Sequence, residues 1–258
     1  MNAITEPTDS SDLPELRIEG AVATIRLRRP AQANRLSADD LERLAALIAE
    51  VNARSEVLVL LLRGSGKYFC SGYDIGSIGA ERKVDFEGVV DALEMARAVT
   101  VAVLHGGVYG GATDLALACD FRVGAIGIDM FMPAARLGLH YYRAGLERYV
   151  SRLGLDNAKL LFLTARKIDA VEMKRIGYLT QLAEPDRLEE EVSALVRDCA
   201  SMAPIALTGM KHHLNRIARG TLDAQALNAS IRRAYLSEDL REGQLAWAQK
   251  RAAKFQGK

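Results

Sequence analysis

Apolar and polar residues alternate with period two at the start of the chain, and a helical spacing follows directly. The segment 15–29, ELRIEGAVATIRLRR, predicts a hairpin that turns near Gly20. Ser37, followed three residues later by Asp40, is typical of a helix start, and the apolar residues that come next share one helical face. A continuous apolar run at 57–62 then predicts a strand that is buried on both faces.

The same order of elements returns at 99–125, VTVAVLHGGVYGGATDLALACDFRVGA, which predicts a strand, a glycine-rich turn, a short helix and a strand. Strands that alternate with helices indicate βαβ units and an α/β fold. From about residue 156 the pattern is mostly helical, with one short helix opened by Asp169 and Glu172. We expect a flexible N-terminal tail at 1–14, a core at 15–200 and a C-terminal helical region at 201–258.

Composition narrows the classes of partner. The 258 residues carry 34 Lys and Arg against 33 Asp and Glu, so no global charge favours nucleic acid or an anionic membrane. Cys70, Cys119 and Cys199 are odd in number and far apart, which predicts neither a disulfide framework nor a metal site. The first residues lack the features of a secretory signal, and no apolar run approaches the ~20 residues of a membrane span, so we expect a cytoplasmic protein.

Two glycine-bearing loops are the strongest candidates for chemistry. FCSGYD at 69–74 and VYGGATD at 108–114 each end a strand, and the second also begins a helix, where unpaired amides favour negative charge. Two such amides that converge on one oxygen would form an oxyanion hole. Taken singly, each loop is better explained as a tight turn, because Gly-Gly and Ser-Gly are common turn signals. Neither contains the phosphate-binding patterns GxxxxGK[ST] or GxGxxG, so we expect no nucleotide cofactor.

Four segments together resemble the crotonase (enoyl-CoA hydratase/isomerase) superfamily. They are GKYFCSGYDI at 66–75, HGGVYGGATDLALACDFRV at 105–123, LTARKIDAVEMKRIGYLTQL at 163–182 and LSEDLREGQLAWAQKRAAKF at 236–255. The resemblance implies an α/β fold built as a spiral of ββα turns, with a C-terminal helical region that forms homotrimers or dimers of trimers. It also implies an acyl thioester of coenzyme A as substrate and no other cofactor.

The resemblance further implies a set of site residues. The backbone N–H groups of Tyr73 and Gly111 would hold the thioester oxygen, while Lys67 would meet the coenzyme A phosphates. The other substrate-contacting positions are Arg35, Leu36, Ser71, Asp74, Ile75, Gly110, Pro133, Ala134, Leu139 and Tyr142.

The chain departs from the hydratase pattern where that pattern has its two glutamates. Asp114 stands at the first position and Ala134 at the second, so the paired carboxylates that would activate water are incomplete. Bulky polar residues, His140, Tyr141 and Tyr142, follow where hydratases are rich in proline and glycine. Tyr141 matches a tyrosine near the substrate carboxylate of a methylmalonyl-CoA decarboxylase-like relative, and His140 would supply a proton if it pointed inward.

Several reactions therefore remain open. An enzyme of this family that stabilises a thioester enolate is the main hypothesis; Asp114 would be the single acid or base for isomerisation. The missing second carboxylate also suits a malonyl-type decarboxylase or a thioester hydrolase. A protein of another class, which binds acyl-CoA without catalysis or serves only as an oligomeric scaffold, is the alternative.

Overall fold

The computed structural model describes residues 12–74, 76 and 84–258. Within them a six-stranded sheet has the order β1-β2-β3-β4-β6-β9, and only the β1–β2 pair is antiparallel. The strands are β1 (Glu15–Glu19), β2 (Val22–Leu27), β3 (Val59–Gly64), β4 (Val99–Leu104), β6 (Phe121–Ala125) and β9 (Gln181–Ala183). The buried apolar residues of β3 and β4 form the centre of the core.

A smaller sheet lies beyond the carboxyl ends of the main strands. It consists of β5 (Val108–Tyr109), β7 (Asp129–Phe131) and β8 (Ile168–Asp169). Isolated bridges join Leu36 to Tyr73 and Cys70 to Val108, so the loops that leave the main sheet are themselves held in register. This pairing fixes both glycine-bearing loops next to one another.

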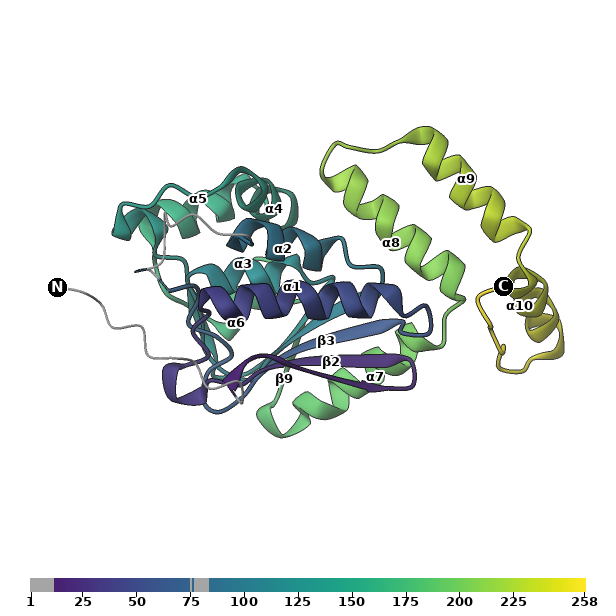
Figure 1. Cartoon of the computed structure of the whole chain (residues 1–258), viewed down its shortest axis with the longest axis horizontal. Coiled ribbons are helices and arrows are strands. Elements are labelled where there is room, and N and C mark those ends of the chain that lie inside the picture. The colour runs from purple at the N-terminus through teal and green to yellow at the C-terminus, as the bar shows by residue number, and fades with distance from the viewer. Residues whose placement is uncertain (1–11, 75, 77–83) are drawn as a thin grey trace.

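Helices cover both faces of the main sheet. Figure 1 shows α1 (Ala38–Ala53) and α3 (Gly111–Ala118) on one face and α7 (Leu188–Ala200) on the other. The helices α2 (Phe86–Glu94), α4 (Arg143–Leu153), α5 (Leu155–Thr164) and α6 (Ala170–Arg175) complete this part. The short 3₁₀ segments are Pro30–Gln32, Ala134–Leu137 and Pro185–Arg187.

The C-terminal part consists of α8 (Pro204–Ala218), α9 (Ala224–Tyr235) and α10 (Glu238–Gln249). Figure 1 shows α8 between the core and α9, with α10 at the far end. Several large apolar side chains on these helices are exposed, among them Met210, Leu214, Tyr235 and Trp247. Among the described residues, no helix combines the length and the apolar character that a membrane crossing requires.

Most elements agree with the sequence-based expectations. The hairpin forms, and the Ser37 hydroxyl accepts from the Asp40 N–H while the Asp40 carboxylate accepts from the Ser37 N–H. Asp169 caps α6 as expected. The strand expected at 57–62 lies two residues later, at Val59–Gly64, because Val57 and Leu58 are buried in the approach to the sheet. The short strands β5, β7, β8 and β9 escaped prediction because two or three residues carry too little pattern.

Candidate active site

The two glycine-bearing loops touch through their backbones. The Tyr109 N–H donates to the Cys70 carbonyl over 3.0 Å, which places the loops side by side. Gly72 has a φ of +98°, and a Cβ there would lie 2.8 Å from the Tyr109 oxygen and 3.0 Å from the Gly111 nitrogen. Gly72 is therefore required both by its own conformation and by the close approach of the second loop.

The direction of the Tyr73 amide follows from its neighbours. The Leu36 N–H donates to the Gly72 carbonyl over 2.8 Å, and the Asp74 N–H donates to the Leu36 carbonyl over 2.9 Å. Because alternate peptide groups of an extended segment face opposite sides, the Tyr73 N–H faces away from Leu36 and toward the second loop.

Gly111 begins α3, so its N–H is one of the four N-terminal amides that have no acceptor within the helix. The preceding Gly110 has a φ of +55°, and its own N–H donates to the Phe131 carbonyl over 3.0 Å. A Cβ on Gly111 would lie 2.9 Å from the ring of Phe86, so this aromatic ring covers the glycine directly. The helix start thus carries a polarised amide beneath an apolar side chain.

Asp114 lies in the first turn of α3 and is completely buried. Its Oδ1 atom accepts from Arg148 Nη1 over 2.7 Å. Its Oδ2 atom accepts from the hydroxyls of Tyr142 and Tyr141, the latter over 3.3 Å. A side chain at Gly145 would collide with this group, because a Cβ there would come 2.8 Å from Oδ2. Both oxygens of the Asp114 carboxylate are therefore engaged by the protein.

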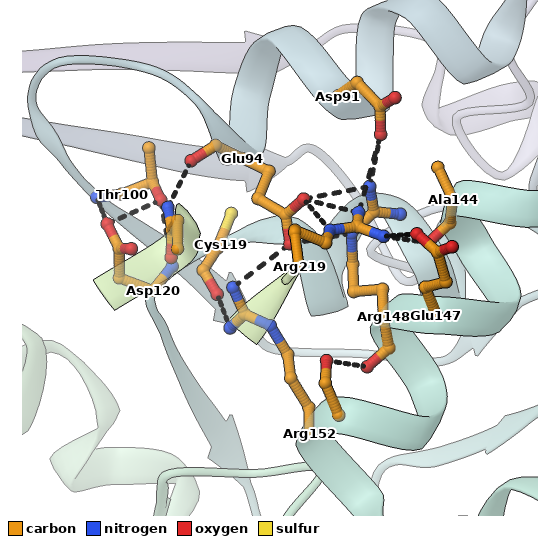
Figure 2. A network of polar contacts seen from close by, with 12 residues as sticks. Asp91, Glu94, Thr100, Cys119, Asp120, Ala144, Glu147, Arg148, Arg152 and Arg219 are labelled. Atoms are coloured by element: carbon orange, nitrogen blue, oxygen red, sulfur yellow. Dashed lines mark hydrogen bonds and ion pairs between the residues drawn. The ribbon is translucent and has the colours of Figure 1, made fainter. Parts of the chain in front are cut away.

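Arg148 is the buried centre of a charge network, which we call the Arg148 network. It comprises Arg148, the buried Glu94 and Asp114, and the partly exposed Asp91 and Arg219. The Nε of Arg148 donates to Glu94 over 3.1 Å and its Nη2 to Asp91 over 2.6 Å. Figure 2 shows Glu94 with dashed lines to both arginines.

Electrostatics favour the charged form of two members of this network. Burial alone would lower the pKa of Arg148, but Asp114 and Glu94 outweigh burial and raise it. Burial alone would raise the pKa of Glu94, but Arg148 and Arg219 outweigh it and hold that pKa below its ordinary value of 4.5. Asp91 differs, because burial outweighs the two arginines there and raises its pKa.

Aromatic rings surround the network on the side of the loops. Tyr141 and Tyr142 stack with ring centroids 4.5 Å apart; the Tyr142 ring meets the Phe86 ring edge-on at 6.2 Å, and Phe86 lies 5.9 Å from the Tyr73 ring. We call Tyr73, Phe86, Tyr141 and Tyr142 the aromatic wall. Burial, and then the charge of Asp114, raises the pKa of both Tyr141 and Tyr142, so their hydroxyls stay protonated at neutral pH.

The residues after the second loop are only partly brought to the site. Ala134 is buried at the start of its 3₁₀ segment, and Pro133 packs near Gly110. Leu139 packs against the core. The structure does not support His140 as the proton donor. Its side chain is exposed and its Nδ1 lies 2.8 Å from the Tyr141 carbonyl, so it does not point inward as a proton donor would have to.

The positions expected to meet coenzyme A are mostly at the surface. Lys67 is exposed, with its ammonium 5.2 Å from the Tyr68 ring centroid. The guanidinium of Arg35 lies 3.5 Å from the Asp74 carboxylate. Ser71 is half-buried.

Of the other two positions expected to meet coenzyme A, Leu36 differs from the expectation and Ile75 is not described by the structure. The Leu36 side chain is buried in the core, so this residue can face a ligand only through its backbone. Ile75 lies outside the described residues.

Sequence reasoning missed the partners of Asp114. Arg148 follows it by 34 positions on another helix, where a charged residue in an amphipathic pattern indicates a solvated face. Glu94 at the end of α2 and Phe86 at its start lie in no sequence motif that would have marked them as site residues. A weak signal was present in the run of tyrosines at 141–142, because two phenols placed near a carboxylate need an acceptor when buried.

Comparisons with known proteins agree with this geometry. A family model described as enoyl-CoA hydratase/isomerase matches residues 17–258. A short-chain-enoyl-CoA hydratase of Clostridium acetobutylicum is 29% identical over 246 residues, covering 92% of this chain and 94% of that protein. A probable enoyl-CoA hydratase of Rhizobium meliloti is 32% identical over 247 residues, covering 92% and 95%.

A solved structure of an enoyl-CoA hydratase/carnithine racemase from Magnetospirillum magneticum is similar with a TM-score of 0.89 and 26% identity. The similarity covers 96% of this chain and 97% of that one. The fold class expected from the sequence is thereby confirmed.

Proposed function

The chain belongs to the enoyl-CoA hydratase/isomerase family, whose members act on CoA thioesters, and we propose that it stabilises a thioester enolate with the N–H groups of Tyr73 and Gly111. The close approach of the two loops at Gly72 and the direction of the Tyr73 amide support this assignment. Each donor of such a hole is worth about 3–4 kcal/mol of transition-state stabilisation.

We further propose that the enolate forms by loss of carbon dioxide from a malonyl-type acyl-CoA rather than by addition of water. Hydration needs a carboxylate that can take a proton from water. Asp114 is completely buried with both oxygens engaged, and by the resemblance Ala134 stands where a hydratase has its second glutamate. The engagement of Asp114 is the single observation that carries this proposal.

Decarboxylation needs no base for its first step. The bond between the α-carbon and the carboxylate breaks, carbon dioxide leaves, and the electron pair stays on the α-carbon and the thioester oxygen as the enolate. A carboxylate held against the apolar face of the aromatic wall loses solvation, which favours its departure as neutral carbon dioxide.

A proton must then reach the α-carbon. Tyr142 packs on Phe86, which itself covers Gly111, whereas Tyr141 packs on Phe162 at 5.1 Å, farther from the loops. We therefore assign the proton to the Tyr142 hydroxyl. Its O–H turns from Asp114 to the α-carbon, a C–H bond forms as the O–H bond breaks, and solvent afterwards reprotonates the phenolate, which again donates to Asp114. Tyr141, which the resemblance placed near the substrate, acts here as a second donor to Asp114.

The remaining assignments rest on the resemblance and stay proposals. Arg35, Lys67, Ser71, Asp74 and Ile75 would line the coenzyme A channel. The exposed apolar residues of α8–α10 support a homotrimer or a dimer of trimers. The cytoplasm remains the predicted compartment.

The test is mass spectrometry of 2-enoyl and malonyl-type acyl-CoAs after incubation with the protein in deuterated water. Loss of carbon dioxide from the malonyl-type compounds, with one deuterium at the α-carbon, is the expected result. Water addition to the enoyl compounds would overturn the proposal, and release of free coenzyme A would point to hydrolysis. If acyl-CoAs raise the melting temperature yet no compound reacts or exchanges its α-protons, the protein is a binding module.

A further inference from the structure

The helix α8 faces the core with polar side chains. Lys211, Asn215 and Arg219 are spaced by four residues and therefore lie on one face of the helix. Lys211 Nζ donates to the Ala98 carbonyl over 2.5 Å and pairs with Asp120 at 2.7 Å, and Asn215 donates to the Glu94 carbonyl over 2.8 Å. This helix of the C-terminal region is thus attached to the core by separate polar contacts at its middle, through Lys211, and at its C-terminal end, through Arg219.

Arg219, at the end of α8, makes the contacts that reach the Arg148 network. Its Nε and Nη2 both donate to Glu94 Oε2, over 3.0 and 2.5 Å, and Nη2 lies 3.7 Å from Asp91. Its Nη1 donates to the Ala144 carbonyl over 2.6 Å and to Glu147 over 3.3 Å. In Figure 2 the guanidinium groups of Arg219 and Arg148 lie next to one another, and dashed lines join both to the Glu94 carboxylate.

The charges of the network explain why Arg219 matters to Asp114. Arg148 contacts three carboxylates, those of Asp91, Glu94 and Asp114. Arg219 shares the first two with it, and Arg152 adds a longer contact of 3.6 Å to Glu94. Without Arg219, Glu94 and Asp91 would attract Arg148 more strongly, in competition with Asp114.

We propose that Arg219 is a positioning residue for the reaction: by neutralising Glu94 and Asp91 it keeps Arg148 on Asp114, and Asp114 in turn holds the Tyr142 hydroxyl in place. This rests on the proposed function, in which Tyr142 delivers the proton. It makes a helix of the C-terminal region part of the active-site support. Within the part of the chain that the structure describes, the polar contacts of Arg219 go to Asp91, Glu94, Ala144 and Glu147, which belong neither to the two loops nor to the aromatic wall.

The test compares two substitutions in the same helix. Arg219→Gln removes the charge beside Glu94 and leaves Glu94 paired with Arg148 and Arg152. Lys211→Met is the matched control, because it loosens the attachment of α8 at the middle of the helix while Asp120 keeps its bonds to Thr100. Glu147→Gln is a second control that removes a carboxylate bound to Arg219 but not to Arg148.

Two readouts are used. The first is the turnover of the malonyl-type acyl-CoA: we expect Arg219→Gln to lower kcat by ~2–30-fold with an unchanged KM, and both controls to stay close to the wild type. The second is the carboxyl carbon resonance of Asp114 in the substrate-free protein, labelled at aspartate and identified by its loss in Asp114→Asn. We expect this resonance to move in Arg219→Gln and to stay in place in Lys211→Met.

These outcomes separate the inference from the proposed function. If the wild type decarboxylates nothing, the proposed function is wrong, and the Asp114 resonance still decides whether Arg219 positions that group. If Lys211→Met and Arg219→Gln move the resonance and kcat equally, Arg219 acts only by docking α8, and the inference is wrong. An Asp114 resonance that does not move in Arg219→Gln also overturns the inference. Arg219→Lys keeps the positive charge, so we expect it to lower kcat less than Arg219→Gln does.

Discussion

Arg148 Nη1 donates to Asp114 Oδ1 over 2.7 Å, and both side chains are completely buried. Removing one partner of such a pair leaves an uncompensated charge in the interior, which is far more costly than replacing both partners. The carboxylate of Asp114 is therefore a fixed acceptor for two tyrosine hydroxyls.

From this pair we predict that Arg148→Met lowers the free energy of unfolding by about 3–5 kcal/mol, because Asp114 loses its buried cation. Urea unfolding of the wild type and the variant measures this difference in free energy. Arg152→Met is the control, since Arg152 is partly exposed and bonds mainly to the Cys119 carbonyl. If the two variants lose the same free energy of unfolding, the contact between Arg148 and Asp114 does not contribute the stability that we predict.

The two tyrosines should differ in their effect on turnover. Tyr142→Phe removes the hydroxyl that we assign as proton donor, so we expect kcat to fall by ~10²–10⁴-fold. Tyr141→Phe removes the longer contact to Asp114, of 3.3 Å, and should cost much less. Single-turnover decarboxylation in deuterated water measures both. The reverse order would make Tyr141 the donor.

Gly72 should tolerate no side chain. Gly72→Ala places a Cβ 2.8 Å from the Tyr109 oxygen, which forces the two loops apart, and we expect a ~10²–10³-fold fall in kcat as one amide moves out of place. Gly127→Ala is the matched control: Gly127 has a φ of +90° with nothing within 4 Å of its Cβ position. That control should lose ~1–3 kcal/mol of stability to backbone strain and keep its kcat.

Glu94 predicts how stability depends on pH. Its pKa is lower in the folded protein than its ordinary value of 4.5, because Arg148 and Arg219 outweigh burial. The folded state therefore gains stability from Glu94 above pH 4.5 and loses it as the pH falls from 4.5 through the folded pKa. Urea unfolding at a series of acidic pH values measures this loss.

Two variants check the pH prediction. Glu94→Gln should show a shallower loss of stability below pH 4.5 than the wild type. If that variant does not fold, Arg219→Gln should show an intermediate slope, because one of the two cations that lower the pKa is gone. Slopes that match the wild type in both would remove Glu94 from the acid response.

The parts of the fold that could be predicted are those set by local sequence. The Ser37 cap, the hairpin and the two glycine-bearing loops each depend on residues a few positions apart, and all are present. The oxyanion assignment needed the resemblance as well, because a turn glycine and a catalytic one have the same local pattern.

The parts that could not be predicted depend on distant residues. Arg148 and Arg219 have the sequence context of solvated helix positions, yet Arg148 is completely buried and Arg219 is half-buried, because both bind Glu94 at the end of α2. His140 shows the opposite error: a polar residue next to two tyrosines of the site turned outward, and its neighbours in sequence gave no sign of this.

The approach of the two loops at Gly72 also bears on how the chemistry of this protein can change over evolution. The donors that we assign to the thioester oxygen belong to the main chain at Tyr73 and Gly111, so a mutation that exchanges the Tyr73 side chain leaves its N–H in place. The groups that would choose the fate of the enolate are side chains. Ala134 and Tyr142 can each be replaced singly, whereas a change at Asp114 requires a compensating change at its buried partner Arg148. We therefore expect new reactions to arise first at Ala134 or Tyr142, while the main-chain donors that we propose for the thioester stay in place.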